Sequence, residues 1–301
     1  MSIFQGLSAF PITPADPSGR VDTAAVARLI ARIAQAGVDS IGLLGSTGAY
    51  AFLTRQERRR TVESALEAAG GEIPVIVGVG AITTIEAVAL AQDAKAAGAD
   101  GLLLAPMSYT PLFEEEVFEH FATVAKAGNL PLCIYNNPST TRFAFSRALI
   151  SRLSKVENIV AVKMPLPSDE DFASELTSLR STTGPGFKVG YSGDWGCPSS
   201  LLAGGDTWYS VVAGLMPSQA LTLARAAQDG DALTVQRMDE AFKPLWALFK
   251  EFGSFRVMYM IAQILDLCVV DPPHPVLPLS DAARHRIVIA LDHIDACNFD
   301  V

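Results

Sequence analysis

The segments QAGVDSIG, residues 35–42, and AAGADGLL, residues 96–103, match almost position for position. Each begins at the end of a helical pattern, passes through Ala-Gly or Ala-Ala-Gly and an aspartate, and continues into a short apolar strand. A helix that stops at glycine and leads at once into a strand is typical of repeated strand–helix units. The pair therefore predicts a chain built from such units.

Short apolar runs of strand type recur along the whole chain, and each ends at a small or polar residue or at proline. They begin near residues 41, 75, 101, 132, 159, 187 and 207, at intervals of about 28 residues, the size of one parallel strand with its crossover helix. The opening run GLSAFPITP, residues 6–14, adds an eighth strand. Eight units favour a closed α/β barrel of the (β/α)8 or TIM type over an open doubly wound sheet. A GxGxxG motif after the first strand, which a dinucleotide fold would need, is absent.

After Pro217 the pattern contains helices only, over residues 217–229, 231–252, 254–265 and 280–293. We interpret the first of these as the last helix of the barrel. The sequence therefore predicts a (β/α)8 barrel over residues 1–230 and a C-terminal helical extension over residues 231–301.

Composition excludes several classes of protein. Of 301 residues, 50% are hydrophobic and 18% are charged, which excludes a disordered chain. So many hydrophobic residues also suggest that some apolar surface is not covered by the chain's own fold. We therefore expect a homo-oligomer, a tetramer or dimer. Four cysteines without paired spacing predict reduced thiols in a cytoplasmic protein, with no metal pattern. The net charge of −9 argues against nucleic acid as a partner. The longest uncharged stretch, 207–224, contains Gly214 and Pro217 and is not a membrane helix.

Polar residues that directly follow the predicted strands are the candidate site residues, because a barrel of this kind carries its active site at the carboxyl ends of its strands. They are Thr13, Ser46, Thr47, Tyr135, Asn136, Asn137, Lys163, Asp194 and Ser210.

Four of these residues, in three places, suggest a particular chemistry, and each place has an ordinary alternative. Lys163 ends the apolar run NIVAVK, where partial desolvation would free its amine as a nucleophile for a ketone; the alternative is a lysine that leaves its strand for solvent. Ser46 and Thr47 lie in a Gly-Ser-Thr-Gly turn whose hydroxyl and N–H groups suit a carboxylate, although many such turns bind nothing. Tyr135 could move protons near the amine, or could be a core tyrosine.

The motifs GSTGAY at 45–50, YNNPS at 135–139, VK at 162–163, SGD at 192–194 and AGGD at 203–206 together resemble the dihydrodipicolinate synthase / N-acetylneuraminate lyase superfamily of pyruvate-dependent class I aldolases. The resemblance covers residues 4–295. It implies a TIM barrel with a C-terminal helical extension, usually in a homotetramer, and catalysis without metal or cofactor. It also implies that Lys163 forms the Schiff base, that Tyr135 relays protons, and that Ser46 and Thr47 hold the substrate carboxylate, with Thr47 also in the catalytic set.

The chain departs from the family pattern on the side of the second substrate. Synthases carry an arginine at the position of Thr140, and Arg142 lies two residues later. The relay tyrosine donated across a subunit contact falls at Ser108, with Tyr109 next to it. Other departures are Ala49 in place of glutamate, Met164 in place of an acidic residue, and the bulky Trp195 after the SGD motif.

The sequence therefore predicts a Schiff-base lyase, an aldolase or dehydratase, that acts on pyruvate or a longer 2-oxo acid. Predicted substrate contacts are Ser46, Thr47, Thr140, Asp194 and Ser210. Two alternatives stay open. One is an authentic 4-hydroxy-tetrahydrodipicolinate (dihydrodipicolinate) synthase in which Arg142 replaces the missing arginine. The other is a catalytically weak paralogue that binds a 2-oxo acid, although such a protein has no need of an imine-forming amine.

Overall fold

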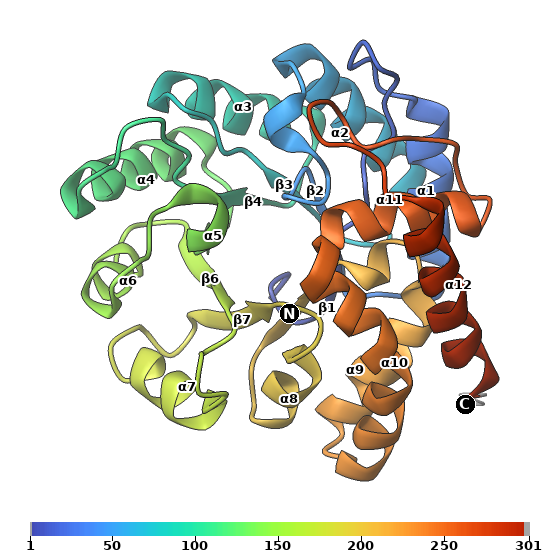
Figure 1. Ribbon diagram of the computed structural model, residues 1–301. Helices are drawn as coiled ribbons and strands as arrows, with labels where there is room; N and C mark the ends of the chain where they lie inside the picture. Colours follow the sequence, from blue (N-terminus) through green and yellow to red (C-terminus); the bar gives the residue numbers. More distant parts are fainter. Residues whose placement is uncertain (1, 298–301) are drawn as a thin grey trace.

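Eight parallel strands close into one barrel in the computed structural model, which describes residues 2–297. Neighbours in sequence pair in order, and β1 pairs with β8 to close the ring (Figure 1). The strands are β1 Gly6–Ala9, β2 Ser40–Leu43, β3 Val75–Gly78, β4 Gly101–Leu104, β5 Leu132–Tyr135, β6 Ile159–Pro165, β7 Lys188–Ser192 and β8 Thr207–Ser210. The predicted (β/α)8 barrel is confirmed.

Helices connect the strands and cover the outside of the barrel (Figure 1). They are α1 Thr23–Ala36, α2 Arg55–Ala69, α3 Thr84–Ala97, α4 Glu114–Gly128, α5 Pro138–Thr141, α6 Arg147–Leu153, α7 Phe172–Arg180, α8 Cys197–Leu202 and α9 Pro217–Gln228, with the short 3-10 helices η1 Tyr50–Phe52 and η2 Val212–Gly214. The ends of α1 carry residues that typically begin and end a helix. The Asp22 side chain accepts a hydrogen bond from Ala25 N at the start of α1, and Gly37 ends that helix with a φ of 79°.

Three more helices follow the barrel: α10 Ala232–Phe252, α11 Ser254–Ile264 and α12 Asp281–Ala296. Helix α10 packs against α9, α11 and α12. The Phe255 ring of α11 stacks on Phe52 of η1, with 6.2 Å between the ring centroids. This contact brings the C-terminal helices to the carboxyl ends of the strands. The predicted division at residue 230 stays a prediction, and residues 298–301 of the predicted extension lie outside the described part of the chain.

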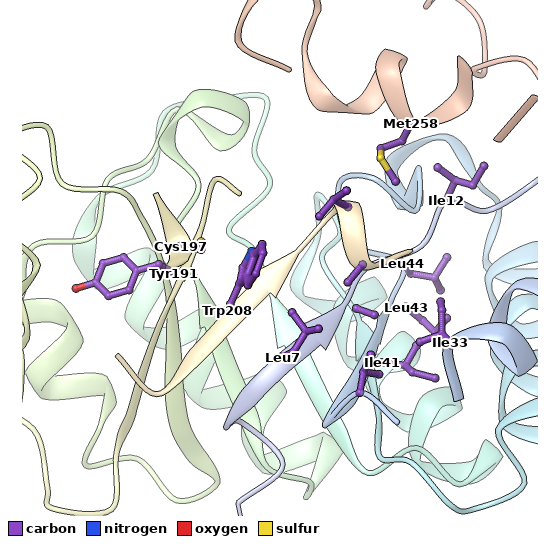
Figure 2. Close-up of a cluster of buried hydrophobic side chains, with 14 of the residues drawn as sticks. Leu7, Ile12, Ile33, Ile41, Leu43, Leu44, Tyr191, Cys197, Trp208 and Met258 are labelled. Carbon is purple, nitrogen blue, oxygen red and sulfur yellow. The ribbon is translucent and has the colours of Figure 1, made fainter. Parts of the chain in front are cut away.

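Two apolar clusters lie on the two sides of the sheet. The outer cluster fills the space between strands and helices; Figure 2 shows part of it, including Met258 of α11 and Ile12. The inner cluster fills the barrel and consists of Phe4, Phe10, Ile76, Leu103, Ala105, Cys133, Tyr135, Ala161 and Tyr209. Alternation along β5 sends Cys133 and Tyr135 inward and Leu132 and Ile134 outward. The upper side chains of the inner cluster therefore form the base of any site at the barrel mouth.

None of the helices within residues 2–297 combines the length and the hydropathy that crossing a bilayer would require.

Candidate active site

Lys163 lies inside the barrel, on β6, with only 3% of its surface exposed. Its Cα is the partner of Tyr135 on the neighbouring strand β5. Because paired residues of adjacent parallel strands point to the same face, the two side chains enter the barrel side by side. The alternative of a lysine that leaves its strand for solvent is therefore wrong.

Aromatic rings surround the Lys163 amine. Its Nζ lies 4.0 Å from the ring centroid of Phe10, 4.3 Å from that of Tyr135 and 5.4 Å from that of Tyr209. The ion pairs found among residues 2–297 do not include Lys163. The faces of the rings are attractive to a cation but form no covalent or ionic bond with it. The amine is thus buried among three aromatic rings.

The position of Phe10 depends on two glycines of the facing strand and turn. A Cβ atom at Gly42 would overlap the Phe10 ring, and one at Gly45 would lie 2.7 Å from Phe10 Cδ1. The ring also meets Tyr209 edge to face, with centroids 5.9 Å apart. Phe10 and Tyr209 therefore belong to the site, and neither was among the residues chosen from the sequence.

A hydrogen-bonded cluster lies next to the amine. The Tyr135 hydroxyl is 3.1 Å from Ser46 Oγ, and Asn137 Nδ2 donates to Tyr135 Oη at 3.0 Å and to Ser46 Oγ at 3.4 Å. These contacts join the end of β5 to the turn after β2. Sequence reasoning placed Asn137 at the mouth without a role; its position two residues beyond Tyr135 was the available signal. The cluster can exchange protons with a group bound at Lys163.

The turn after β2 is held in an uncommon backbone conformation. Leu44 has a φ of 54° and Ala49 a φ of 55°, in the left-handed region that ordinary residues seldom adopt. A Cβ atom at Gly48 would lie 2.9 Å from Leu44 N, so this position requires glycine. Thr47 is buried and Ser46 is half-buried. The turn thus brings the Ser46 hydroxyl to Tyr135, while Thr47 next to it is buried.

Asp194 is buried beneath the loop that follows β8. Its carboxylate accepts hydrogen bonds from Trp208 Nε1 at 2.7 Å and from the N–H groups of Val211 and Val212 at 3.2 Å. Burial raises its pKa from 3.8 to about 6, and the hydrogen bonds oppose that rise. The neighbouring Ser210 hydroxyl accepts from Ala213 N at 3.1 Å. Both side chains hold this loop in place; their contact with substrate stays a prediction.

Thr140 occupies the position at which the related synthases carry an arginine, and Arg142 is the residue that could compensate. Thr140, in α5, is exposed, and its hydroxyl donates to Asn137 O at 3.3 Å. Arg142 ends α5 with a φ of 56° and is also exposed. Trp195 is half-buried, with Lys250 Nζ 5.4 Å from its ring centroid.

The two candidates for a relay across subunits lie in the loop after β4. The Ser108 hydroxyl donates to the Thr110 carbonyl. Tyr109 is 95% exposed, and nearby Phe113 is 77% exposed. Tyr109 therefore projects from the surface of its own chain, and the predicted role across a subunit contact stays a prediction.

A cavity of about 290 Å³ begins at Ser46 and extends toward the C-terminal helices. Its walls are Ser46, Ala49, Tyr50, Ala51, Phe52, Met107, Thr140, Thr141, Phe255 and Val276. No sequence signal indicates this cavity, because η1 and α11 are far apart in the chain. Within residues 2–297, His, Cys, Asp and Glu side chains do not gather in the groups of three or more that could hold a metal ion.

Comparison with known proteins agrees with this geometry. The model of the dihydrodipicolinate synthetase family matches residues 3–294.

A 4-hydroxy-tetrahydrodipicolinate synthase of Phenylobacterium zucineum is 32% identical over 294 residues, 96% of this chain and 97% of that protein. A crystal structure from Agrobacterium tumefaciens described as dihydrodipicolinate synthase has a TM-score of 0.96 and 60% identity, covering 97% of this chain and 98% of that one. The dihydrodipicolinate synthase structure from Aquifex aeolicus has a TM-score of 0.89 and 29% identity, covering 99% and 100%. The chain therefore belongs to the dihydrodipicolinate synthetase family of aldolase-type lyases.

Proposed function

We propose that the protein is a lyase of the aldolase or dehydratase type in which Lys163 forms a Schiff base with pyruvate or a longer 2-oxo acid. The observation that carries this proposal is the buried Lys163 amine, enclosed by three aromatic rings and adjacent to the cluster of Ser46, Tyr135 and Asn137. A buried lysine without an acidic partner is costly to keep for structure alone.

The chemistry follows from the amine. Lys163 Nζ attacks the ketone carbon, and loss of water gives a protonated imine that withdraws electrons from the adjacent carbon. Loss of a proton from that carbon gives an enamine, which can add to an aldehyde. The same electron sink supports the reverse cleavage and the elimination of a hydroxyl group. The positive charge that stabilises the carbanion therefore comes from the imine itself.

The groups around the amine supply binding and proton transfer. In this proposal Ser46 and Thr47, with the N–H groups of their turn, bind the carboxylate of the 2-oxo acid. The Tyr135 hydroxyl, hydrogen-bonded to Ser46 and Asn137, is placed to carry protons between the imine and the substrate oxygen.

The names of the relatives favour one member of this class, 4-hydroxy-tetrahydrodipicolinate synthase. In that reaction pyruvate condenses with aspartate semialdehyde. Thr140 is the observation against it, because threonine cannot make the bidentate, charged contact that arginine makes with a carboxylate. Arg142 is the group that would have to compensate.

The test is reduction of the imine. Borohydride added with pyruvate should give an adduct on Lys163 that mass spectrometry can map, and Lys163→Ala should give none. An adduct that persists in Lys163→Ala, or its absence in the wild type, would refute the mechanism. Turnover of pyruvate with aspartate semialdehyde near the enzyme median of about 10 per second would favour the synthase.

The assembly belongs to the same proposal. We expect a homo-oligomer, a tetramer or dimer, in which the exposed Tyr109 and Phe113 become covered.

A further inference from the structure

We infer that the second substrate of this lyase is an aldehyde with an uncharged, largely apolar side chain, bound in the cavity between Ser46 and Phe255. The inference rests on the proposed Schiff-base function and names the class of electrophile that the enamine attacks. It concerns the 290 Å³ cavity, not the part of the site that holds the 2-oxo acid.

The cavity adjoins the reacting groups through Ser46, which lines it. The Ser46 hydroxyl is 3.1 Å from the Tyr135 hydroxyl, and the Tyr135 ring centroid is 4.3 Å from Lys163 Nζ. A molecule bound in the cavity would therefore contact the residue that is hydrogen-bonded to the proposed proton carrier. A second cavity, of about 450 Å³, lies on the other side of η1 and is lined by residues such as Asp16, Tyr259 and His274. Its walls do not include Ser46, the residue through which the smaller cavity adjoins the cluster of reacting groups.

The described residues that line the smaller cavity carry no charge. Ala49, Ala51, Met107, Phe255 and Val276 supply apolar atoms. The polar groups are hydroxyls, and the Thr140 and Thr141 hydroxyls already donate to Asn137 O. A carboxylate buried there would lose its water without gaining a cation, whereas a hydrocarbon chain would leave water for apolar contacts.

Among residues 2–297, the arginines stay out of the walls of this cavity. Arg142 is exposed and is absent from its lining. Arg58 is buried close by, but its guanidinium donates to Gly80 O at 3.0 Å and Gly78 O at 2.7 Å and lies over the Tyr50 ring. The ring thus separates this charge from the cavity. At about 30 Å³ for each non-hydrogen atom, the volume accepts an aldehyde of up to roughly ten such atoms.

The reaction balances without a further reactant. The enamine carbon bonds to the aldehyde carbon, the aldehyde oxygen takes a proton, and water hydrolyses the imine. The products are a 4-hydroxy-2-oxo acid with an apolar tail and the free Lys163 amine.

Butanal and succinic semialdehyde form a matched pair of probes, because they have the same four-carbon chain and differ by one carboxylate. Each is incubated with pyruvate and the intact enzyme, and kcat/KM is measured from the formation of the 4-hydroxy-2-oxo acid. We expect kcat/KM for butanal to exceed that for succinic semialdehyde by at least about ten-fold. Thr140→Arg should reduce or invert this ratio, because it places a cation in the cavity wall.

Val276→Asp adds a carboxylate to the wall and should lower kcat/KM for butanal, while the pyruvate adduct on Lys163 still forms. Val269→Asp, at a position that is 95% exposed, is the control and should change neither kcat/KM for butanal nor the formation of the pyruvate adduct. Equal or better turnover of succinic semialdehyde by the wild type overturns the inference, as does failure to use either aldehyde while the adduct forms. Absence of the adduct instead refutes the Schiff-base function itself.

Discussion

Replacement of Asp194 by asparagine tests the electrostatics at the base of the site. The carboxylate is 2% exposed and accepts hydrogen bonds from the Trp208 indole and from two backbone N–H groups. Burial is the largest influence on this group and raises its pKa from 3.8 to about 6. The folded protein therefore holds a proton on Asp194 in a pH range where the unfolded chain has released it.

The sign of the effect on stability follows from the proton count. Between pH 3.8 and about 6 the folded state binds more protons than the unfolded state, so the free energy of unfolding falls as the pH rises through this range. At about 1.4 kcal/mol for each pKa unit, the whole effect is about 3 kcal/mol, of which about 2 kcal/mol falls between roughly pH 4.5 and 7.5. Above about pH 7.5 the contribution of Asp194 to the free energy of unfolding no longer changes with pH.

The asparagine side chain of the Asp194→Asn variant cannot titrate, and its amide offers only one oxygen to three N–H donors. The substitution should therefore cost about 1–3 kcal/mol at low pH, from the unsatisfied donors. This deficit relative to the wild type should shrink by about 2 kcal/mol between roughly pH 4.5 and 7.5. Urea unfolding at a fixed protein concentration measures the deficit at low pH and its change with pH. In the wild type, the fluorescence emission of Trp208, whose indole donates to the Asp194 carboxylate, should follow the same titration.

Val269→Asn, which exchanges one side chain that does not titrate for another at a position that is 95% exposed, is the control and should show a difference from the wild type that does not change with pH. If the Asp194→Asn deficit is also independent of pH, the carboxylate is not held protonated by burial and the reasoning fails.

Three further predictions concern the site and the assembly. Gly42→Val should destabilise the fold by about 1–3 kcal/mol because its side chain overlaps the Phe10 ring, and Phe10→Ala in the same chain should recover part of the loss in urea unfolding; an undiminished loss would place the strain elsewhere. Tyr135→Phe should keep the borohydride adduct with pyruvate but lower kcat by about 10²–10⁴; full turnover would remove Tyr135 from proton transfer. Tyr109→Asp should shift the sedimentation profile toward smaller species, whereas a wild-type monomer at micromolar concentration would contradict the proposed assembly.

The barrel and its chemical centre were largely predictable because both depend on local signals. The match between residues 35–42 and 96–103 marks the repeat, and each strand end follows from an apolar run that stops at a small or polar residue. Closure of the barrel then places Lys163 and Tyr135 on adjacent strands in register. Two residues that are 28 positions apart in the chain became neighbours because one strand–helix unit separates them.

The enclosure of the amine could not be predicted, because it depends on contacts across the barrel. Phe10 occupies the centre only because Gly42 and Gly45 leave room for its ring, and Tyr209 reaches it from the last strand. A phenylalanine after a strand and a glycine inside a strand are each ordinary in sequence. Only the closed barrel makes them complementary.

The two halves of the site, one proposed for each substrate, also differ in how far the sequence predicts them. The half of the site proposed to hold the 2-oxo acid is built from the ends of β2, β5 and β6, where motif and strand end coincide, and the Ser46 and Tyr135 hydroxyls meet there. The second half is built from η1, α5 and α11. The resemblance implies that Thr140 stands where synthases carry an arginine, but a missing cation alone does not indicate which aldehyde the cavity binds. We infer that the preference depends on Phe255 of α11 and on Val276, which lies between α11 and α12; both line the cavity. On this proposal, specificity is set where the C-terminal part of the chain meets η1. Substitutions there should alter the aldehyde used while leaving imine formation at Lys163 intact.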